Sequence, residues 1–158
     1  MTPFEVVSLI LAFAAIIVSI IAYRKADTAT TKANNIALGN FELYIGERIT
    51  STKEKVSDVS LQMATLISKQ KRTADDEKVL AIFEKVFKAA VENNINAYED
   101  ACAKYLDKKV DQIRFEKLYK AEIRQLVESD DLSEYFDGVT SKYKAILKVY
   151  DQWENLEK

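Results

Sequence analysis

The apolar residues of this chain follow two different patterns, and the first is almost continuous. From Phe4 to Tyr23 the sequence reads FEVVSLILAFAAIIVSIIAY, a run of twenty residues whose one charge, Glu5, lies at its outer end. At about 1.5 Å per residue, a helix of this length measures about 30 Å, the thickness of a bilayer's hydrocarbon core. Its Phe, Val, Leu and Ile residues favour insertion by about 4 to 7 kcal/mol at most. The run therefore predicts a membrane-spanning helix.

The residues that flank this run predict its orientation. No Lys or Arg precedes it and no A-x-A cleavage site ends it, so we expect an uncleaved anchor rather than a signal peptide. Arg24, Lys25 and Lys32 follow the run, and the positive-inside rule then places the N-terminus outside and the remaining chain in the cytoplasm. The prediction is a single-pass protein of the cell inner membrane. The lone Cys102 fits a reducing compartment.

Small residues recur along one face of the same run, at spacings of four, three, four and three. We call this set the small-residue seam: Ser8, Ala12, Ala15, Ser19 and Ala22. The pattern continues beyond the anchor through Ala26, Ala29 and Ala33. Small residues let helix backbones approach closely in lipid, so the seam predicts a homo-oligomer, with Glu5 joining the seam residues in a pore lining. The alternative is that Ala and Ser simply fill a spanning helix.

After residue 40 the apolar positions recur at helical spacing, which predicts a bundle of amphipathic helices. Gly39 is expected to end the first helix, and a second helix is expected from Phe41 to about Gln70. The fold class is therefore all-α, with an N-terminal single-pass transmembrane helix extended into a cytoplasmic four- to five-helix bundle. The expected divisions are a transmembrane anchor over 1–23, a membrane-proximal helix extension over 24–40 and a cytoplasmic helical domain over 41–158.

Capping residues predict where the later helices begin. Thr73 is expected to cap the third helix and Asp111 the fourth, while Thr140 or Ser141 is expected to begin the last.

Polar residues interrupt the apolar faces of the predicted helices after residue 40, namely Thr52, Asn93, Asn94, Asn96 and Glu122. Most Tyr residues and the one Trp keep the apolar phase, so we expect them in the core.

Composition excludes several classes of function. Lys and Arg number 23 and Asp and Glu 25, so the chain is nearly neutral and lacks the basic excess of a protein that binds bulk nucleic acid. There is no His and only one Cys, which removes the commonest general base and the usual metal ligands. There is also no Gly-rich phosphate loop and no Ser/His/Asp set. We therefore expect a protein that is not an enzyme and carries neither metal nor cofactor.

Two groups of charged residues are candidate sites. Glu99, Asp100 and Lys104 share one helix and could form a polar site, although such spacing is typical of solvated pairs. The second group is a possible phosphate- or ligand-binding set on the fourth helix, formed by Arg114, Lys117, Lys120 and Arg124. Repeated around an oligomer, these cations could hold the phosphates of a nucleotide or a lipid headgroup. The alternative, favoured by the interleaved carboxylates, is a solvated surface.

In layout the chain resembles the small membrane-anchored helical effector and accessory proteins of CRISPR-linked bacterial antiviral defence. The resemblance places the anchor at Phe4 to Tyr23 and the bundle at about Phe41 to Leu156. It implies an oligomer that perforates or depolarises the membrane, in some relatives when a nucleotide signal binds. Some relatives carry a nuclease motif of Arg, four to six residues, then His. This chain has no His, so nuclease activity is not implied.

Together these features predict a homo-oligomeric membrane effector, pore-forming or membrane-perturbing, used in antiviral defence. The expected partners are the membrane, further copies of the chain, and a nucleotide second messenger or a defence-complex protein. The alternative function is a passive membrane-anchored helical interaction module that recruits a cytoplasmic partner.

Overall fold

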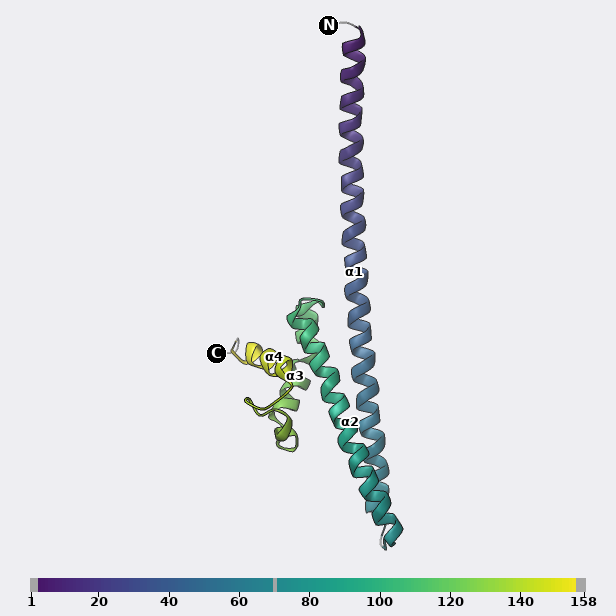
Figure 1. Cartoon of the computed structure of the whole chain (residues 1–158), viewed down its shortest axis with the longest axis vertical. Helices are drawn as coiled ribbons and strands as arrows, with labels where there is room; N and C mark the ends of the chain where they lie inside the picture. Colours follow the sequence, from purple (N-terminus) through teal and green to yellow (C-terminus); the bar gives the residue numbers. More distant parts are fainter. Residues whose placement is uncertain (1–2, 70, 156–158) are drawn as a thin grey trace. The chain divides into compact units, whose positions relative to one another are not determined.

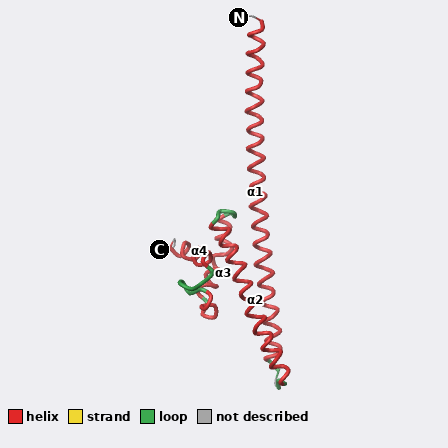
Figure 2. The backbone as a smooth tube through the Cα atoms, viewed as in Figure 1, coloured by secondary structure: helices red, strands yellow, loops and turns green. Residues whose placement is uncertain are grey.

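The computed structural model describes the backbone of residues 3–69 and 71–155, and the side chains of residues 16–69 and 71–155. The described chain is helical and contains no strand (Figure 1). Its elements are α1 (Pro3–Ile67), α2 (Ala74–Leu106), α3 (Gln112–Glu128), the 3-10 helix η1 (Asp130–Tyr135) and α4 (Lys144–Asn155). Short loops join the later helices (Figure 2). The predicted all-α class is confirmed.

The chain divides into two units, Met1–Asn40 and Phe41–Lys158. Helix α1 begins in the first unit and ends in the second. All other helices belong to the second unit, which also holds the buried apolar core.

The predicted helix end at Gly39 is wrong, because α1 continues through it to Ile67. A glycine that ends a helix adopts a left-handed backbone conformation, and no described glycine has a positive φ. Gly46 does not interrupt α1 either; a glycine inside a helix costs only about 1 kcal/mol relative to Ala. The helix predicted from Phe41 is therefore the last part of α1.

Within the described residues, no helix is long and apolar enough to cross a membrane. The predicted span begins at Phe4, and its side chains up to residue 15 lie outside the described residues.

Helix α2 begins with the predicted cap. The Thr73 hydroxyl accepts a hydrogen bond from the Asp76 backbone N–H at 3.2 Å, and the Asp76 carboxylate accepts one from the Thr73 N–H at 2.9 Å. This reciprocal pair is a capping box, which satisfies backbone donors that the first helical turn leaves free. The Lys69 ammonium, 2.7 Å away, and the two Thr73 donors lower the pKa of Asp76 from 3.8 to about 2.

Helix α2 ends without glycine. Lys108 adopts a left-handed conformation with φ 57°, the Lys109 N–H donates to the Lys104 carbonyl at 2.9 Å, and the Lys108 N–H donates to the Tyr105 carbonyl at 3.0 Å. These two bonds form a Schellman motif. The next helix, α3, begins after the predicted cap, since the Asp111 carboxylate accepts from the Arg114 N–H at 2.9 Å.

Helix α4 begins at Lys144, later than predicted, because Asp137 holds the preceding residues in a turn. Its carboxylate accepts from the backbone N–H groups of Val139 and Thr140, at 3.0 and 2.9 Å, and these bonds lower its pKa. The cap of α4 comes from another helix. Glu99 of α2 accepts from the N–H groups at the start of α4, those of Ala145 and Ile146, at 2.9 and 3.0 Å.

The core lies where α2 and α3 pack against α4. Its least exposed members include Ile95, Tyr98, Cys102, Phe115, Ile123, Tyr143, Ile146, Val149 and Trp153. The Trp153 indole N–H donates to the Tyr105 hydroxyl at 3.1 Å, so the buried N–H has a hydrogen-bond acceptor. The core placement predicted for these aromatic residues is confirmed.

Candidate ligand-binding groove

The predicted oligomerisation residues lie on α1 in the first unit. Ser19 and Ala22 are exposed on this helix, and so are the Ala residues that continue the seam. The side chains of Glu5, Ser8, Ala12 and Ala15 lie outside the described residues.

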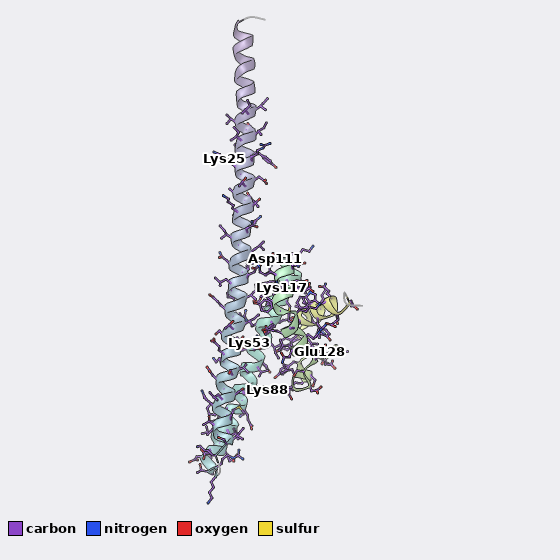
Figure 3. The ribbon with its side chains drawn as sticks, turned by 180° about the vertical axis from the view of Figure 1, so that it is seen from behind. Lys25, Lys53, Lys88, Asp111, Lys117 and Glu128 are labelled. Atoms are coloured by element: carbon purple, nitrogen blue, oxygen red, sulfur yellow. The ribbon has the colours of Figure 1, made fainter. Side chains whose placement is uncertain are left out.

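Three of the four cations predicted to bind phosphate have a carboxylate partner in the structure. Arg114 pairs with Glu42 of α1 at 2.7 Å, and Lys120 lies 3.4 Å from Glu116 on its own helix. Arg124 pairs with Glu154 of α4 through Nε at 2.9 Å, so the two arginines bind carboxylates on different helices. The fourth cation, Lys117, is exposed and is labelled in Figure 3.

The polar group on α2 has a structural role. Glu99 caps α4, as described above, while Asp100 accepts from Arg48 of α1 at 2.9 Å and from Lys104 at 2.5 Å. Glu99 thus joins α2 to α4, and Asp100 joins it to α1. Nearby Cys102 is fully buried, and burial raises the pKa of its thiol far above the ordinary range.

Two of the polar interruptions noted in the sequence meet each other. Asn94 of α2, 9% exposed, donates from Nδ2 to the Thr52 hydroxyl of α1 at 2.9 Å. Thr52 has one hydroxyl hydrogen, and this hydrogen is directed at the carbonyls of Arg48 and Ile49, each 3.0 Å away. The Thr52 oxygen must therefore accept from Asn94, which fixes the orientation of the Asn94 amide. Among the described residues, no donor reaches the other atom of that amide, Oδ1.

Glu122 also interrupts an apolar face in the sequence, and in the structure it joins α3 to α1 and α2. It accepts from the Tyr98 hydroxyl at 2.6 Å and from the Lys53 ammonium at 2.5 Å. Burial, followed by the hydrogen bond to Glu122, raises the pKa of Tyr98 far above its ordinary value. Tyr98 therefore stays a hydrogen-bond donor at every physiological pH.

These polar contacts border a groove made of two adjoining hollows in the second unit. The apolar hollow has a volume of about 610 Å³, and its apolar lining is Val56, Phe87, Val91, Ile95, Leu126, Leu132 and Tyr135. The polar hollow, about 180 Å³, is lined by Lys53, Tyr98, Glu122 and Gln125. Asn94, Leu126, Ser129 and Leu132 line both hollows. A volume of this size lies within the range of small-molecule sites.

Charged residues at the groove are largely paired. Lys88 of α2 lies 3.3 Å from Glu134 of η1, and Lys53 pairs with Glu122. Asp131 lines the apolar hollow as well, so the five charged residues of the lining comprise two cations and three carboxylates. Figure 3 labels Lys53 on α1 and Lys88 on α2, one from each hollow. The groove is thus apolar along its floor and weakly acidic at its rim.

The described residues contain no cluster of three or more Asp, Glu or Cys side chains placed to hold a metal ion.

The sequence marked Thr52, Asn94 and Glu122 as exceptions to the apolar pattern. It did not show that all three border one groove, because their convergence depends on how α1, α2 and α3 pack together.

Comparison with known proteins finds no matching family model, no similar curated protein and no similar solved structure. The resemblance to CRISPR-linked membrane proteins therefore stays a prediction.

Proposed function

We propose that this protein is a membrane-anchored homo-oligomer whose first helix crosses the bilayer between residues 4 and 23. The support is the unlike pair of faces that α1 presents between residues 16 and 22. Its large aliphatic residues there are between 50% and 64% exposed, namely Ile16, Ile17, Val18, Ile20 and Ile21. Such a set of exposed apolar side chains needs a nonpolar environment that the first unit itself does not supply.

The two faces can be placed by helical geometry. At about 100° per residue, the five aliphatic residues cover about 200° of the helix circumference, from Ile16 round to Val18. Ser19 and Ala22 fall in the remaining sector, beside the position of Ala15. The face with bulky aliphatic residues suits contact with lipid. The face with small residues suits contact with a second helix, because small residues allow close backbone approach. This arrangement supports self-association through the small-residue seam.

The activity that follows from this proposal is membrane perturbation. One helix encloses no channel, so conduction needs several copies, with the seam towards the centre and Glu5 forming a carboxylate ring that favours cations. A role in antiviral defence remains a prediction from layout alone. We propose no catalytic activity for the chain.

The alternative is a passive anchored module that holds a partner at the membrane. The observation that favours it is the groove in the second unit, a binding feature that a pore does not need. The two functions differ in what the first 23 residues must do. A passive anchor works with any spanning helix, whereas a pore requires this one.

The experiment compares the natural protein with Ser19→Leu and with Val18→Leu, a control that enlarges the bulky face instead. The particle mass in mild detergent and dye leakage from phosphatidylcholine vesicles are measured for all three. We expect Ser19→Leu to lower the oligomer mass and abolish leakage, and Val18→Leu to change neither. A natural protein that is monomeric would overturn the homo-oligomer. An oligomer that causes no leakage would favour the passive module.

A further inference from the structure

We propose that the groove between α1, α2, α3 and η1 binds an uncharged, largely apolar small molecule that donates one hydrogen bond to Oδ1 of Asn94. This inference concerns the second unit and does not depend on how the first helix acts in a membrane.

The first step is the unused acceptor. Thr52 fixes the orientation of the Asn94 amide by accepting one hydrogen bond from Nδ2, and Oδ1 receives no hydrogen bond from the described residues. Yet Oδ1 is not sealed inside the protein. Among the described residues, the Tyr143 hydroxyl is the one fully enclosed side-chain polar atom without a partner. Asn94 lines both hollows, which places its side-chain amide at the groove.

The second step is the apolar lining. Phe87 and Val91 of α2, Leu126 of α3 and Leu132 of η1 are all half-buried, so each leaves apolar surface facing the hollow. A ligand that covered these side chains would gain from their removal from water. The Asn94 acceptor therefore lies beside an apolar lining, and in small-molecule sites a few polar groups usually set the orientation of the ligand.

The third step is charge. Both lysines of the lining already pair with glutamates, and Asp131 adds a further carboxylate. An anionic ligand would find no unpaired cation and would face net negative charge at the rim. Asn94 Oδ1 is an acceptor without a donor, which favours ligands that can donate a hydrogen bond. The groove therefore favours a neutral N–H or O–H donor on an apolar body.

The test uses two probes of nearly the same shape, indole and benzofuran, of which only indole has an N–H. Binding to the full chain in phosphatidylcholine nanodiscs is measured by isothermal titration, with empty nanodiscs subtracted to remove partition into lipid. We expect indole to bind at least tenfold more tightly than benzofuran. The anion indole-3-acetate should bind more weakly than indole.

Two variants locate the binding. Asn94→Leu removes the acceptor at similar side-chain volume, so the affinity for indole should fall to the affinity for benzofuran. Leu126→Trp fills the hollow from α3 and should lower the affinity for both probes. Ile113→Trp, on an exposed part of the same helix, should change neither affinity. Equal affinity of the two probes for the natural protein would overturn the proposal, and so would tighter binding of indole-3-acetate. Failure of both probes to bind would overturn it as well.

Discussion

The two units of this chain place their apolar residues in opposite ways. In the first unit, the aliphatic residues of α1 from Ile16 to Ile21 are at least half exposed. In the second unit, Ile95, Ile123 and Ile146 have no exposed surface at all. Isoleucine side chains are therefore buried within the chain in the second unit and left exposed in the first. The comparison teaches that the second unit covers its own apolar residues, whereas the described part of the first unit leaves them exposed, as the proposed contact with lipid or another copy requires.

The largest expected effect lies in the core of the second unit. Trp153→Ala removes a buried indole and its bond to Tyr105, and should lower the free energy of unfolding by about 3 to 5 kcal/mol. Trp153→Phe, which keeps an aromatic ring, should cost less. Thermal unfolding followed by circular dichroism measures both. Membrane association of the chain should survive, since the first unit is untouched; its loss would show that the units are not independent.

The reverse experiment disturbs the first unit. Ile16→Arg places a charge in the predicted span and should disfavour insertion by about 3 to 4 kcal/mol, which offsets much of the about 4 to 7 kcal/mol in its favour and should lower the share of protein in the membrane fraction. Ala29→Arg, beyond the predicted span, is the matched control and should leave the protein in that fraction. The measurement is resistance to alkaline extraction. If Ile16→Arg stays membrane-bound, the anchor is wrongly placed.

A smaller effect tests how the second unit satisfies its own polar groups. Glu99→Ala removes the acceptor for two backbone donors at the start of α4, and should cost about 1 to 2 kcal/mol of stability. Glu99→Gln retains an acceptor oxygen and should cost less. Amide hydrogen exchange should rise first at Ala145 and Ile146. Uniform exchange across the second unit, with no local increase, would contradict the capping role.

The smallest effect is a dependence on pH at the start of α2. Because folding lowers the pKa of Asp76 from 3.8 to about 2, Asp76 stabilises the fold above about pH 4, and this contribution is lost as the pH falls towards 2. An NMR titration of the Asp76 carboxyl carbon should show the low pKa directly. Lys69→Ala removes the largest cause of the shift and should raise the pKa towards its ordinary value. An unchanged pKa in that variant would assign the shift to Thr73 alone.

Local signals predicted much of the second unit. Thr73 and Asp111 cap helices as expected because a cap depends on a few adjacent residues whose chemistry is visible in the sequence. Helix ends were harder to predict. Helix α1 passes through Gly39 without ending, whereas α2 ends at Leu106 and is followed by Lys108 in a left-handed conformation that glycine would adopt more easily. A glycine in the sequence is therefore compatible with a helix end but does not by itself predict one.

The candidate groove was not predicted, because its parts come from four separate elements. Asn94 was noted only as a break in an apolar face, and its partner Thr52 lies 42 residues earlier in the chain. Glu99 was grouped with its neighbours on α2, but in the structure it serves α4. A sequence shows which polar residues are out of place in a pattern. It does not show which of them will meet.

The apolar run of the first 23 residues, the helical class and the caps of α2 and α3 follow from the sequence alone, because each depends on composition or on residues close together in the chain. The capping of α4 by Glu99 and the open Asn94 acceptor depended on tertiary packing. Packing brings together residues that are far apart in sequence, and the hydrogen bonds and hollows at the meeting points of helices exist only once those helices have met.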